Sequence, residues 1–543
     1  MSESAVVTAT GQGAAGDPDR WWRGGVFYQI YPRSYADSNN DGVGDLPGII
    51  AKLDHLERLG IDGVWLSPAT CSPNTDWGYD VSDYRDIDPD YGTLDDLDTL
   101  VREAGARGIR ILMDLVPNHS SDQHAWFVDA LTGRDARYRD YYVWADPKPD
   151  GSPPNNWVSS FGGSAWELDE ASGQFYLHNF EVEQPDLNWW NEEVRREFDE
   201  IVKFWWDRGV AGFRIDVCNG IVKDKELRDN PPATEDDPLE QRFMGVKPVY
   251  NTNRPEAHDV VRRWRSIADT YEPERLLIGE TYVESLEQLV EYYGDGHNEL
   301  HGGFNFVLIH GPLDPAVMRS VVEKTEALLP EGGWPIWTGS NHDESRLSTR
   351  WAGGDQAKVK VALLMLLTVR GTPFLYAGDE IGLVDGELDR EDARDRVGIR
   401  YWPYYKGRDF ERTPMPWHGG PGGGFSAPGV KPWLPMTDPA SCNVADQEGD
   451  PTSVLEFCRR VIAARRASDD LAVGAYRSLP SAEGTWAYAR GAGTVVLLNM
   501  SDTDAEFADV RGTVVVATDG SLEGSVAEGA LTLAPWSGAV VAE

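Results

Sequence analysis

The stretch Gly212-Phe-Arg-Ile-Asp-Val217 decides how the rest of the chain is interpreted. It is a short, mostly apolar run that carries an arginine and an aspartate two positions apart. A run of this length predicts a buried β-strand, and residues i and i+2 of a strand face the same side. We therefore expect Arg214 and Asp216 to point together from the end of one strand.

Seven other apolar runs of similar length alternate with segments in which apolar residues recur every three or four positions. The eight expected strands are Val26–Tyr35, Gly63–Pro68, Ile109–Val116, Gly212–Val217, Leu276–Glu280, Gly303–His310, Trp334–Ser340 and Thr372–Gly378. The expected helices between them include Gly48–Leu59, Leu94–Ala106, Glu192–Asp207, His258–Tyr271, Pro315–Leu329 and Ala357–Val369. This alternation predicts an α/β fold, a (β/α)8 TIM barrel.

The alternation of strands and helices is interrupted twice by long segments, and the sequence pattern changes near the C-terminus. These features predict further domains. Asn118–Trp190 is too long for a loop and indicates a small inserted domain after strand 3. A second excursion, from Glu380 to near Asp450, precedes a last helix at Val454–Ala467. From Ser468 short alternating runs predict a C-terminal antiparallel β-sandwich domain. The expected division is a disordered tail over 1–20, a barrel over 21–118 and 191–467, an inserted domain over 119–190 and a C-terminal β domain over 468–543.

Composition excludes several classes of partner. The chain has 543 residues and a formal net charge of −40, so its surface should repel nucleic acid and anionic membranes. Its 21 Trp and 21 Tyr are suited to stacking on sugar rings. No run reaches the ~18 apolar residues of a membrane span, and four scattered cysteines without C-x-x-C spacing indicate neither a zinc site nor a disulfide framework. We therefore expect reduced thiols and a cytoplasmic location.

Ionisable residues follow the expected strands at their carboxyl ends, where barrel enzymes place their catalytic groups. The stretches are Asp114-Leu-Val-Pro-Asn-His119, Arg214-Ile-Asp216, Gly279-Glu280 and Asn341-His342-Asp343. A lone aspartate at such a place usually caps a helix or forms an ion pair. Here four stretches each follow their own expected strand. Together they predict one pocket shared by several carboxylic acids, an arginine and two histidines.

These four stretches, in their order and spacing, resemble the motifs of the α-amylase superfamily of retaining glycoside hydrolases, specifically its α-glucosidase and oligo-1,6-glucosidase branch. The resemblance runs from about Trp22 to the end of the chain. Gln184-Pro-Asp-Leu-Asn188 and Arg412-Thr-Pro-Met-Pro-Trp417 are similar to markers of that branch.

The resemblance implies three catalytic carboxyl groups. Asp216 matches the nucleophile, Glu280 the general acid and base, and Asp343 the carboxylate that grips the 2- and 3-hydroxyls of the sugar. Retaining chemistry needs the first two about 5–5.5 Å apart. We expect Arg214 to keep Asp216 ionised, and Glu280 to have a raised pKa so that it stays protonated.

The resemblance also implies a closed sugar pocket. Asp76 matches the group that binds the 4- and 6-hydroxyls of a terminal glucose, and Tyr79 the ring that stacks on it. His119 and His342 are expected to hydrogen-bond the same sugar, and Arg412 to reach Asp76 and seal the far side. A sealed pocket favours exo-action. Arg346 and Phe161 are expected at the entrance, and Val217 accompanies α-1,6 preference in the oligo-1,6-glucosidase group, although one methyl-sized difference does not settle linkage.

Asp37-Ser-Asn39-Asn-Asp41-Gly-Val43-Gly-Asp45 places oxygen ligands at alternate positions and resembles the opening of a calcium loop. The candidate ligands are Asp37, Asn39, Asp41, the Val43 carbonyl and Asp45. The resemblance implies a structural Ca2+ or Mg2+ remote from the chemistry, which itself needs no cofactor. Without the resemblance, a loop of Asx-turns is an equal expectation.

The sequence therefore predicts a retaining exo-α-glucosidase that acts on short oligosaccharides or disaccharides. A transglucosidase or sugar isomerase of the trehalose synthase or isomaltulose synthase type remains open, because it shares every catalytic residue. An inactive binding subunit is disfavoured, because Asp216 and Glu280 are both present and no membrane segment is. The sequence does not predict an oligomeric state.

Overall fold

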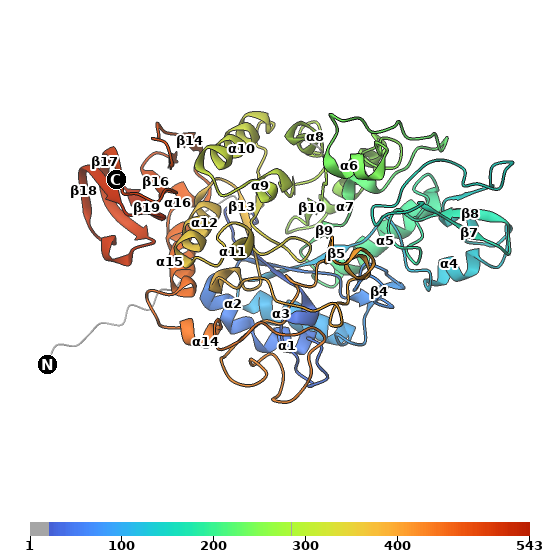
Figure 1. The fold of residues 1–543 in the computed structure, drawn as a ribbon, viewed down its shortest axis with the longest axis horizontal. Helices are drawn as coiled ribbons and strands as arrows, with labels where there is room; N and C mark the ends of the chain where they lie inside the picture. The colour runs from blue at the N-terminus through green and yellow to red at the C-terminus, as the bar shows by residue number, and fades with distance from the viewer. Residues whose placement is uncertain (1–20, 284) are drawn as a thin grey trace.

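Eight parallel strands form the centre of the molecule (Figure 1). A computed structural model describes residues 21–283 and 285–543, and the tail expected over 1–20 lies outside them. The strands are β1 (Phe27–Ile30), β2 (Gly63–Leu66), β5 (Arg110–Leu115), β9 (Gly212–Ile215), β10 (Leu276–Gly279), β11 (Gly302–Gly303), β12 (Ile336–Thr338) and β13 (Thr372–Tyr376). They pair in the order β11-β10-β9-β5-β2-β1-β13-β12, and a parallel bridge between Phe304 and Ile336 joins the two edges. The sheet is thus the expected barrel, nearly closed.

Alternate residues of the strands fill the barrel. One buried cluster contains Phe27, Trp65, Leu112, Leu276, Ile278, Phe304, Ile336 and Phe374. Gly212 leaves room for it, because a Cβ there would lie 2.3 Å from the carbonyl oxygen of Leu276. Two positions further along three of these strands the same face carries Asp114, Arg214 and Glu280, as strand alternation requires.

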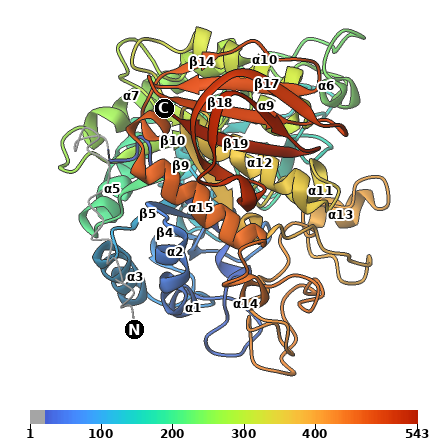
Figure 2. The same cartoon turned by 90° about the vertical axis from the view of Figure 1, so that its left-hand side faces the viewer.

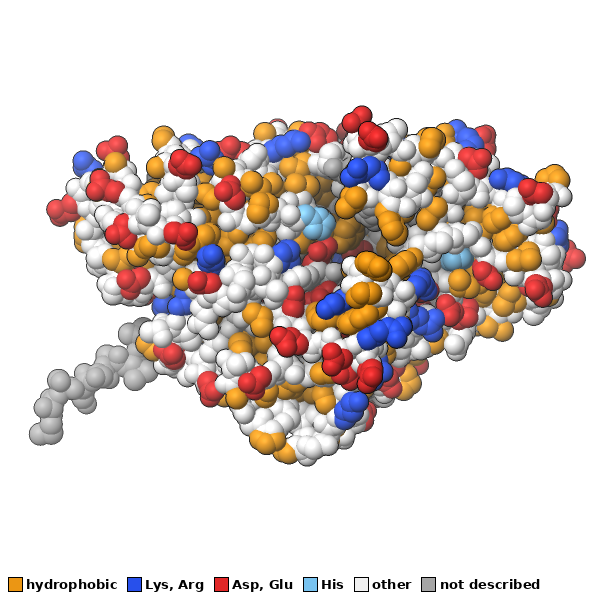
Figure 3. Space-filling model, viewed as in Figure 1, with side chains coloured by type: hydrophobic (Ala, Val, Ile, Leu, Met, Phe, Trp, Pro, Cys, Tyr) orange, Lys and Arg blue, Asp and Glu red, His pale blue; other side chains and the backbone are white. Residues whose placement is uncertain are grey.

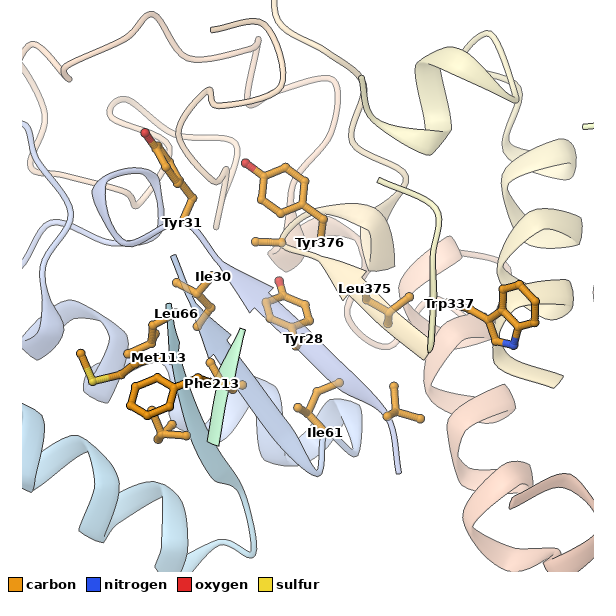
Figure 4. Packing of buried hydrophobic residues seen from close by; sticks show 14 of the residues in the cluster. Tyr28, Ile30, Tyr31, Ile61, Leu66, Met113, Phe213, Trp337, Leu375 and Tyr376 are labelled. Carbon is orange, nitrogen blue, oxygen red and sulfur yellow. The ribbon is translucent and has the colours of Figure 1, made fainter. Parts of the chain in front are cut away.

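The other strand face packs against helices, as the cluster around Tyr28, Ile30, Leu66, Met113 and Phe213 shows (Figure 4). The helices around the barrel are α1 (Leu46–Ala51), α2 (Leu53–Leu59), α3 (Leu94–Ala106), α5 (Glu192–Asp207), α6 (Leu239–Met244), α7 (Ala257–Ala268), α8 (Leu286–Glu291), α9 (Phe306–His310), α10 (Pro315–Leu328), α11 (Leu347–Arg350), α12 (Gln356–Thr368) and α15 (Val454–Ala467). Side-chain caps define several starts, for example the capping box that Thr93 and Asp96 form on α3.

Most expected elements are confirmed, and three are corrected. The expected strand Val26–Tyr35 is too long, because β1 ends at Ile30 and Pro32–Ser34 is a 3-10 helix that begins at the proline. The expected strand Gly303–His310 is mostly wrong, because β11 ends at Gly303 and Phe306–His310 is the helix α9. The side chain of Asn305 accepts the Leu308 N–H and so caps this helix. A short apolar run fits a strand and a buried helix equally well. The expected helix Gly48–Leu59 is two helices that meet at Lys52.

The insertion after β5 contains a small antiparallel sheet, which lies at the right of Figure 1. Its elements are α4 (Ala125–Ala130), β6 (Trp144–Ala145), β7 (Trp166–Asp169) and β8 (Gln174–Leu177), and the strand order is β6-β8-β7. Trp157, Trp166 and Phe175 belong to a separate core cluster there. Before it, β3 (Thr70–Cys71) and β4 (Asp83–Ile87) form a hairpin whose connection carries Asp76. The domain boundaries themselves stay a prediction.

The C-terminal strands form an antiparallel domain beside the barrel (Figure 2). After α16 (Asp469–Ala472) come β14 (Tyr476–Ser478), β15 (Thr485–Arg490), β16 (Thr494–Asn499), β17 (Ala505–Ala517), β18 (Val526–Leu533) and β19 (Ser537–Ala542). Hydrogen bonds join all six into one antiparallel sheet in the order β14-β15-β16-β19-β17-β18. Trp486 and Val540 belong to the cluster that includes α12, whereas their neighbours Ala487 and Val541 belong to the domain's own core, so the sheet is buried on both faces.

The excursion between β13 and α15 crosses the mouth of the barrel. It is irregular apart from α13 (Arg396–Tyr401) and α14 (Val444–Gln447). Backbone hydrogen bonds from Met415 to Ser34 and from Asp37 to Phe425 attach it to the loop after β1. No helix among the described residues is both long and apolar enough to cross a membrane.

A matched pair of glycine substitutions tests the packing of the barrel. Gly212→Ala should lower the free energy of unfolding by about 1–3 kcal/mol, because its Cβ meets the rigid backbone of β10 at 2.3 Å. Gly105→Ala on α3 finds nothing within 4 Å and should raise the free energy of unfolding by about 0.5 kcal/mol. Urea unfolding measures both, and equal effects of the two variants would contradict this account of the barrel interior.

Candidate active site

A buried arginine holds three carboxyl groups together at the barrel mouth. Nη1 of Arg214 lies 2.7 Å from Oδ1 of Asp216 and 2.9 Å from Oδ1 of Asp114, and Nη2 donates to Oε1 of Glu280. The guanidinium also lies over the Trp65 ring, 5.1 Å from its centroid. Asp114, Arg214 and Glu280 come from or directly follow the adjacent strands β5, β9 and β10, so strand pairing fixes their spacing.

The carboxyl groups of Asp216 and Glu280 lie close together, because both accept hydrogen bonds from the planar guanidinium of Arg214. A second hydrogen bond fixes Glu280: its Oε2 accepts the N–H of Val217 at 3.0 Å. Val217 has φ 44° and ψ 42°, a left-handed conformation that is strained for a β-branched residue. Val217 directly follows Asp216, and this conformation directs the Val217 N–H towards Glu280.

The protonation of this cluster follows from its burial. Burial raises the pKa of Asp216 well above its ordinary value, against the effect of Arg214, and the charges of Glu280 and Asp114 add to the rise. Burial also raises the pKa of Asp114 to about 7. Arg214 acts in the expected direction and favours ionised Asp216, but burial and the two neighbouring acids outweigh it in the cluster. Three buried carboxyl groups share one guanidinium, so the cluster retains protons near neutral pH.

Asp343 is surrounded by two arginines and a histidine instead. Its Oδ1 lies 2.6 Å from Nη2 of Arg412 and 3.2 Å from Nη1 of Arg408, and its Oδ2 lies 3.1 Å from Nε2 of His342. Burial alone acts to raise the pKa of Asp343, but these neighbours outweigh burial and lower it. Asp343 is thus an ionised carboxylate held between two arginines.

The arginine that reaches Asp76 is Arg408, not the expected Arg412. Nη2 of Arg408 lies 2.7 Å from Oδ1 of Asp76, and the same guanidinium pairs with Asp395 at 2.9 Å and with Asp343. Arg412 turns towards Asp343 and donates to the carbonyl of His342 at 2.7 Å. Sequence reasoning missed Arg408 and Asp395, and the only signal was a second arginine four residues before the Arg412 motif.

The two histidines are buried behind the carboxylates. His342 contacts Gln29 through Nδ1 at 2.8 Å and the Tyr79 hydroxyl through Nε2 at 2.5 Å, and its ring stacks on that of Tyr79. His119 contacts Asn118 through Nδ1 and the Tyr79 carbonyl through Nε2. Burial lowers the pKa of His119 to about 4 and that of His342 well below its ordinary value, so both are neutral at pH 7.

Phe161 and Arg346 occupy different places. Phe161 lies in the insertion, and the Arg408 guanidinium stands 5.3 Å from the centre of its ring, which puts Phe161 beside the pocket. Arg346 is 2% exposed and donates to the carbonyls of Ala377 and Glu411. It connects the excursion to the end of β13. The expectation that Arg346 lies at the entrance is therefore wrong.

The candidate cation loop is folded by its own hydrogen bonds. Asp37 accepts the N–H groups of Asn40 and Gly42, Asp41 accepts that of Val43, and Asp45 caps α1 by accepting the N–H of Gly48. Among the described residues, no ion pair includes Asp37, Asp41 or Asp45. This leaves the loop with uncompensated negative charge, which fits a hard cation chemically.

A separate group of possible ligand atoms, Asp269, Glu274 and His301, does not fit a metal. Nδ1 of His301 accepts the Leu277 N–H at 3.0 Å, so Nε2 carries the proton and faces Glu274 at 3.1 Å. Arg265 pairs with both carboxylates and supplies the positive charge.

A barrel whose strand ends carry paired acids, with a third carboxylate and arginines around them, has the architecture of a glycoside hydrolase. The profile of the "Alpha amylase, catalytic domain" matches residues 29–474. The chain belongs to this alpha-amylase family.

Similar proteins carry related names. The chain is 44% identical to a "Probable alpha-glucosidase" of Rhizobium meliloti (strain 1021), over 90% of this chain and 91% of that one. It is 39% identical to an "Oligo-1,6-glucosidase" of Heyndrickxia coagulans, over 90% and 93%. Among solved structures, an "alpha-glucosyl transfer enzyme, XgtA" has a TM-score of 0.89 and 41% identity, covering 96% of this chain and 99% of that one. The "trehalulose synthase MutB" has a TM-score of 0.86 and 34% identity, covering 96% and 99%.

The raised pKa of Asp114 predicts a pH-dependent stability. A carboxyl group whose pKa is raised by folding stabilises the folded state at low pH, and this contribution is lost as pH rises through the folded-state value. For Asp114 the loss falls between about 4 and about 7. The Asn side chain of Asp114→Asn does not titrate. The melting temperature of this variant minus that of the wild type should therefore increase as pH rises from 4 to 8. A difference between the two proteins that stays constant with pH would contradict the assignment.

Proposed function

We propose that the chain is a retaining exo-acting α-glucosidase that releases glucose from the non-reducing end of short α-glucosides. The observation that carries the proposal is the pair of arginines at the barrel mouth. Arg214 brings Asp216 and Glu280 together, and Arg408 links Asp76 to Asp343 across the pocket. The names of the relatives support the same activity.

In the proposed first step, Asp216 attacks the anomeric carbon while Glu280 protonates the glycosidic oxygen. The bond from that carbon to the leaving oxygen breaks as the bond to Asp216 forms, which gives a covalent glucosyl-Asp intermediate. Glu280, now a carboxylate, takes a proton from water, whose oxygen attacks the same carbon and releases Asp216. The cluster around Arg214 supplies what this sequence needs, namely a proton shared by neighbouring carboxyl groups and a cation that favours ionised Asp216.

The sugar itself is proposed to bind between the carboxylates that the second arginine joins. Asp76 and Arg408 suit the 4- and 6-hydroxyls, and the ionised Asp343 suits the 2- and 3-hydroxyls. Tyr79 is proposed to stack on the ring, while His119 and His342 act from behind it. Arg408 is proposed to close the side opposite the acids, so that one glucosyl unit fits and a polymer does not pass through.

A transglucosidase or sugar isomerase is the second candidate. The structures of the alpha-glucosyl transfer enzyme and of the trehalulose synthase support it, since both are more than 30% identical to this chain. A second sugar would then replace water in the attack on the intermediate. Val217 supports a preference for α-1,6 bonds, although one methyl-sized contact is worth only about 1–3 kcal/mol.

A product time course separates the two candidates. Maltose, isomaltose, sucrose and trehalose are each incubated with the wild type and with Asp216→Ala, and products are identified by chromatography. Accumulation of free glucose and the second sugar supports hydrolysis, whereas a rearranged disaccharide supports transfer. Asp216→Ala should lose activity by on the order of 10⁴-fold on every substrate, because no nucleophile remains.

The control is Glu200→Gln, which removes an exposed carboxylate on α5. It should keep full activity and the same melting temperature. An Asp216→Ala protein that folds and keeps wild-type turnover would refute the role of Asp216.

We also propose a structural cation, Ca2+ or Mg2+, in the loop from Asp37 to Asp45, held by Asp37, Asn39, Asp41, the Val43 carbonyl and Asp45. The acidic groups there, which form no ion pair among the described residues, support it. A cytoplasmic location is proposed as well, supported by the four cysteines, which are all free thiols in the described residues.

Metal removal tests the cation. Treatment with a chelator should lower the melting temperature by several degrees, and added Ca2+ should restore it, because a ligand at 100 times its Kd stabilises the folded state by about 2.7 kcal/mol. Asp41→Ala should show neither change and keep its activity on α-glucosides. A melting temperature that does not respond to chelator or Ca2+ in the wild type would rule the site out.

A further inference from the structure

Two segments that are far apart in the sequence meet over the pocket. One is the last part of the insertion, from Phe161 to Gln184, and the other is α13 of the excursion. Figure 3 shows a hollow near the centre of this face, with hydrophobic and basic side chains gathered on its lower rim. Residues of α13 contact the insertion directly, so the two segments form a common roof.

Ion pairs and hydrogen bonds hold this roof together. Nη2 of Arg400 lies 2.6 Å from Oε2 of Glu181 and 2.9 Å from Oε1, and Nη1 donates to the Phe161 carbonyl at 3.1 Å. The Tyr401 hydroxyl donates to the same carbonyl at 3.0 Å. Arg396 pairs with Glu183 at 2.6 Å. Every one of these contacts joins α13 to the insertion.

The Arg400–Glu181 pair is unlike an ordinary surface ion pair. The Glu181 side chain is 4% exposed, and Arg400 is its cationic partner among the described residues. Removing one partner of a buried pair leaves an uncompensated charge, which is strongly unfavourable. Loss of Arg400 should therefore displace Glu181 towards solvent rather than leave it in place.

Displacement of Glu181 reaches the pocket through one residue. The Glu181 N–H donates to Oε1 of Gln184 at 3.0 Å, and Nε2 of Gln184 donates to Oδ2 of Asp76 at 3.3 Å. The other oxygen of Asp76 accepts from Arg408, which lies on the same excursion as Arg400. The contacts thus run from Arg400 through Glu181, Gln184 and Asp76 to Arg408, which the polypeptide chain connects back to Arg400.

We propose that Arg400 is a positioning residue that sets how tightly the pocket holds a terminal glucosyl unit. It acts through Glu181 and Gln184 on Asp76, and it touches neither the reacting atoms nor the sugar. This role rests on the proposed function, in which Asp76 binds the sugar. Because the acids around Arg214 stand on barrel strands and not on the roof, Arg400 governs affinity and leaves the chemical step largely unchanged.

The test compares Arg400→Gln with a matched control. Arg400→Gln should raise the KM for maltose and the inhibition constant of glucose by about tenfold each, with kcat within threefold of the wild type. Arg400→Lys should restore part of the affinity, since it keeps the charge. The control is Arg228→Gln, which also removes a half-exposed arginine from a buried carboxylate, Asp224, but on a pair that does not join the roof. Its KM should stay at the wild-type value.

A charge-reversed pair and hydrogen exchange give readouts that a general loss of stability does not mimic. Arg400→Glu combined with Glu181→Arg should recover most of the affinity that either change alone removes. Amide exchange at residues 396–401 and 161–163 should quicken in Arg400→Gln and not in Arg228→Gln.

The outcomes distinguish this inference from the function beneath it. A wild type that releases no glucose from any α-glucoside and does not bind glucose overturns the proposed function, and with it the affinity role of Arg400. A wild type that does both, with an Arg400→Gln protein whose KM, inhibition constant and exchange match those of Arg228→Gln, overturns the role of Arg400 alone.

Discussion

The buried guanidinium of Arg214 is the constraint on which the rest of the site depends. A buried carboxylate is stable only where a cation or hydrogen-bond donors compensate it, and here one arginine serves Asp114, Asp216 and Glu280. The barrel makes this possible, because Arg214 is in register with Asp114 on β5 and Ile278 on β10. Three carboxyl groups with one arginine must share protons, and a site that both donates and accepts a proton needs such sharing.

Arg408 plays the corresponding part for Asp76 and Asp343, the carboxylates proposed to bind the sugar, but it comes from an irregular segment. Its guanidinium joins Asp76, Asp343 and Asp395, which lie in three different connections of the chain. The proposed reacting groups therefore stand at the ends of strands, whereas the groups proposed to enclose the sugar stand on loops. Loops of this kind are held only by their mutual contacts, which is why ion pairs between the excursion and the insertion matter for the pocket.

The sequence predicted what depends on local periodicity and missed what depends on packing. Alternation along a strand was enough to place Arg214 and Asp216 on one face. Alternation does not show which arginine of the long excursion reaches Asp76. The sequence therefore predicts Arg412 for this contact, whereas Arg408 makes it. The run Gly303–His310 was ambiguous for the same reason, since only the Asn305 cap decides for a helix. The sequence places Asp114 and Glu280 near Asp216, but it does not give the degree of burial, and burial is the largest influence that raises the pKa of Asp216 against the effect of Arg214.

The difference between groups on strands and groups on loops also explains why hydrolysis and transfer are hard to distinguish by sequence in this family. Proteins named as glucosidases, glucosyl transfer enzymes and trehalulose synthases all align over most of this chain. Both reactions use one glucosyl intermediate, so the strand-borne acids are under the same demands in each. What differs is whether water or a second sugar reaches the anomeric carbon. The ion pairs that join α13 to the insertion involve neither Arg214 nor the carboxyl groups that it binds, so the contacts of the roof can differ between relatives without disturbing the strand-borne acids.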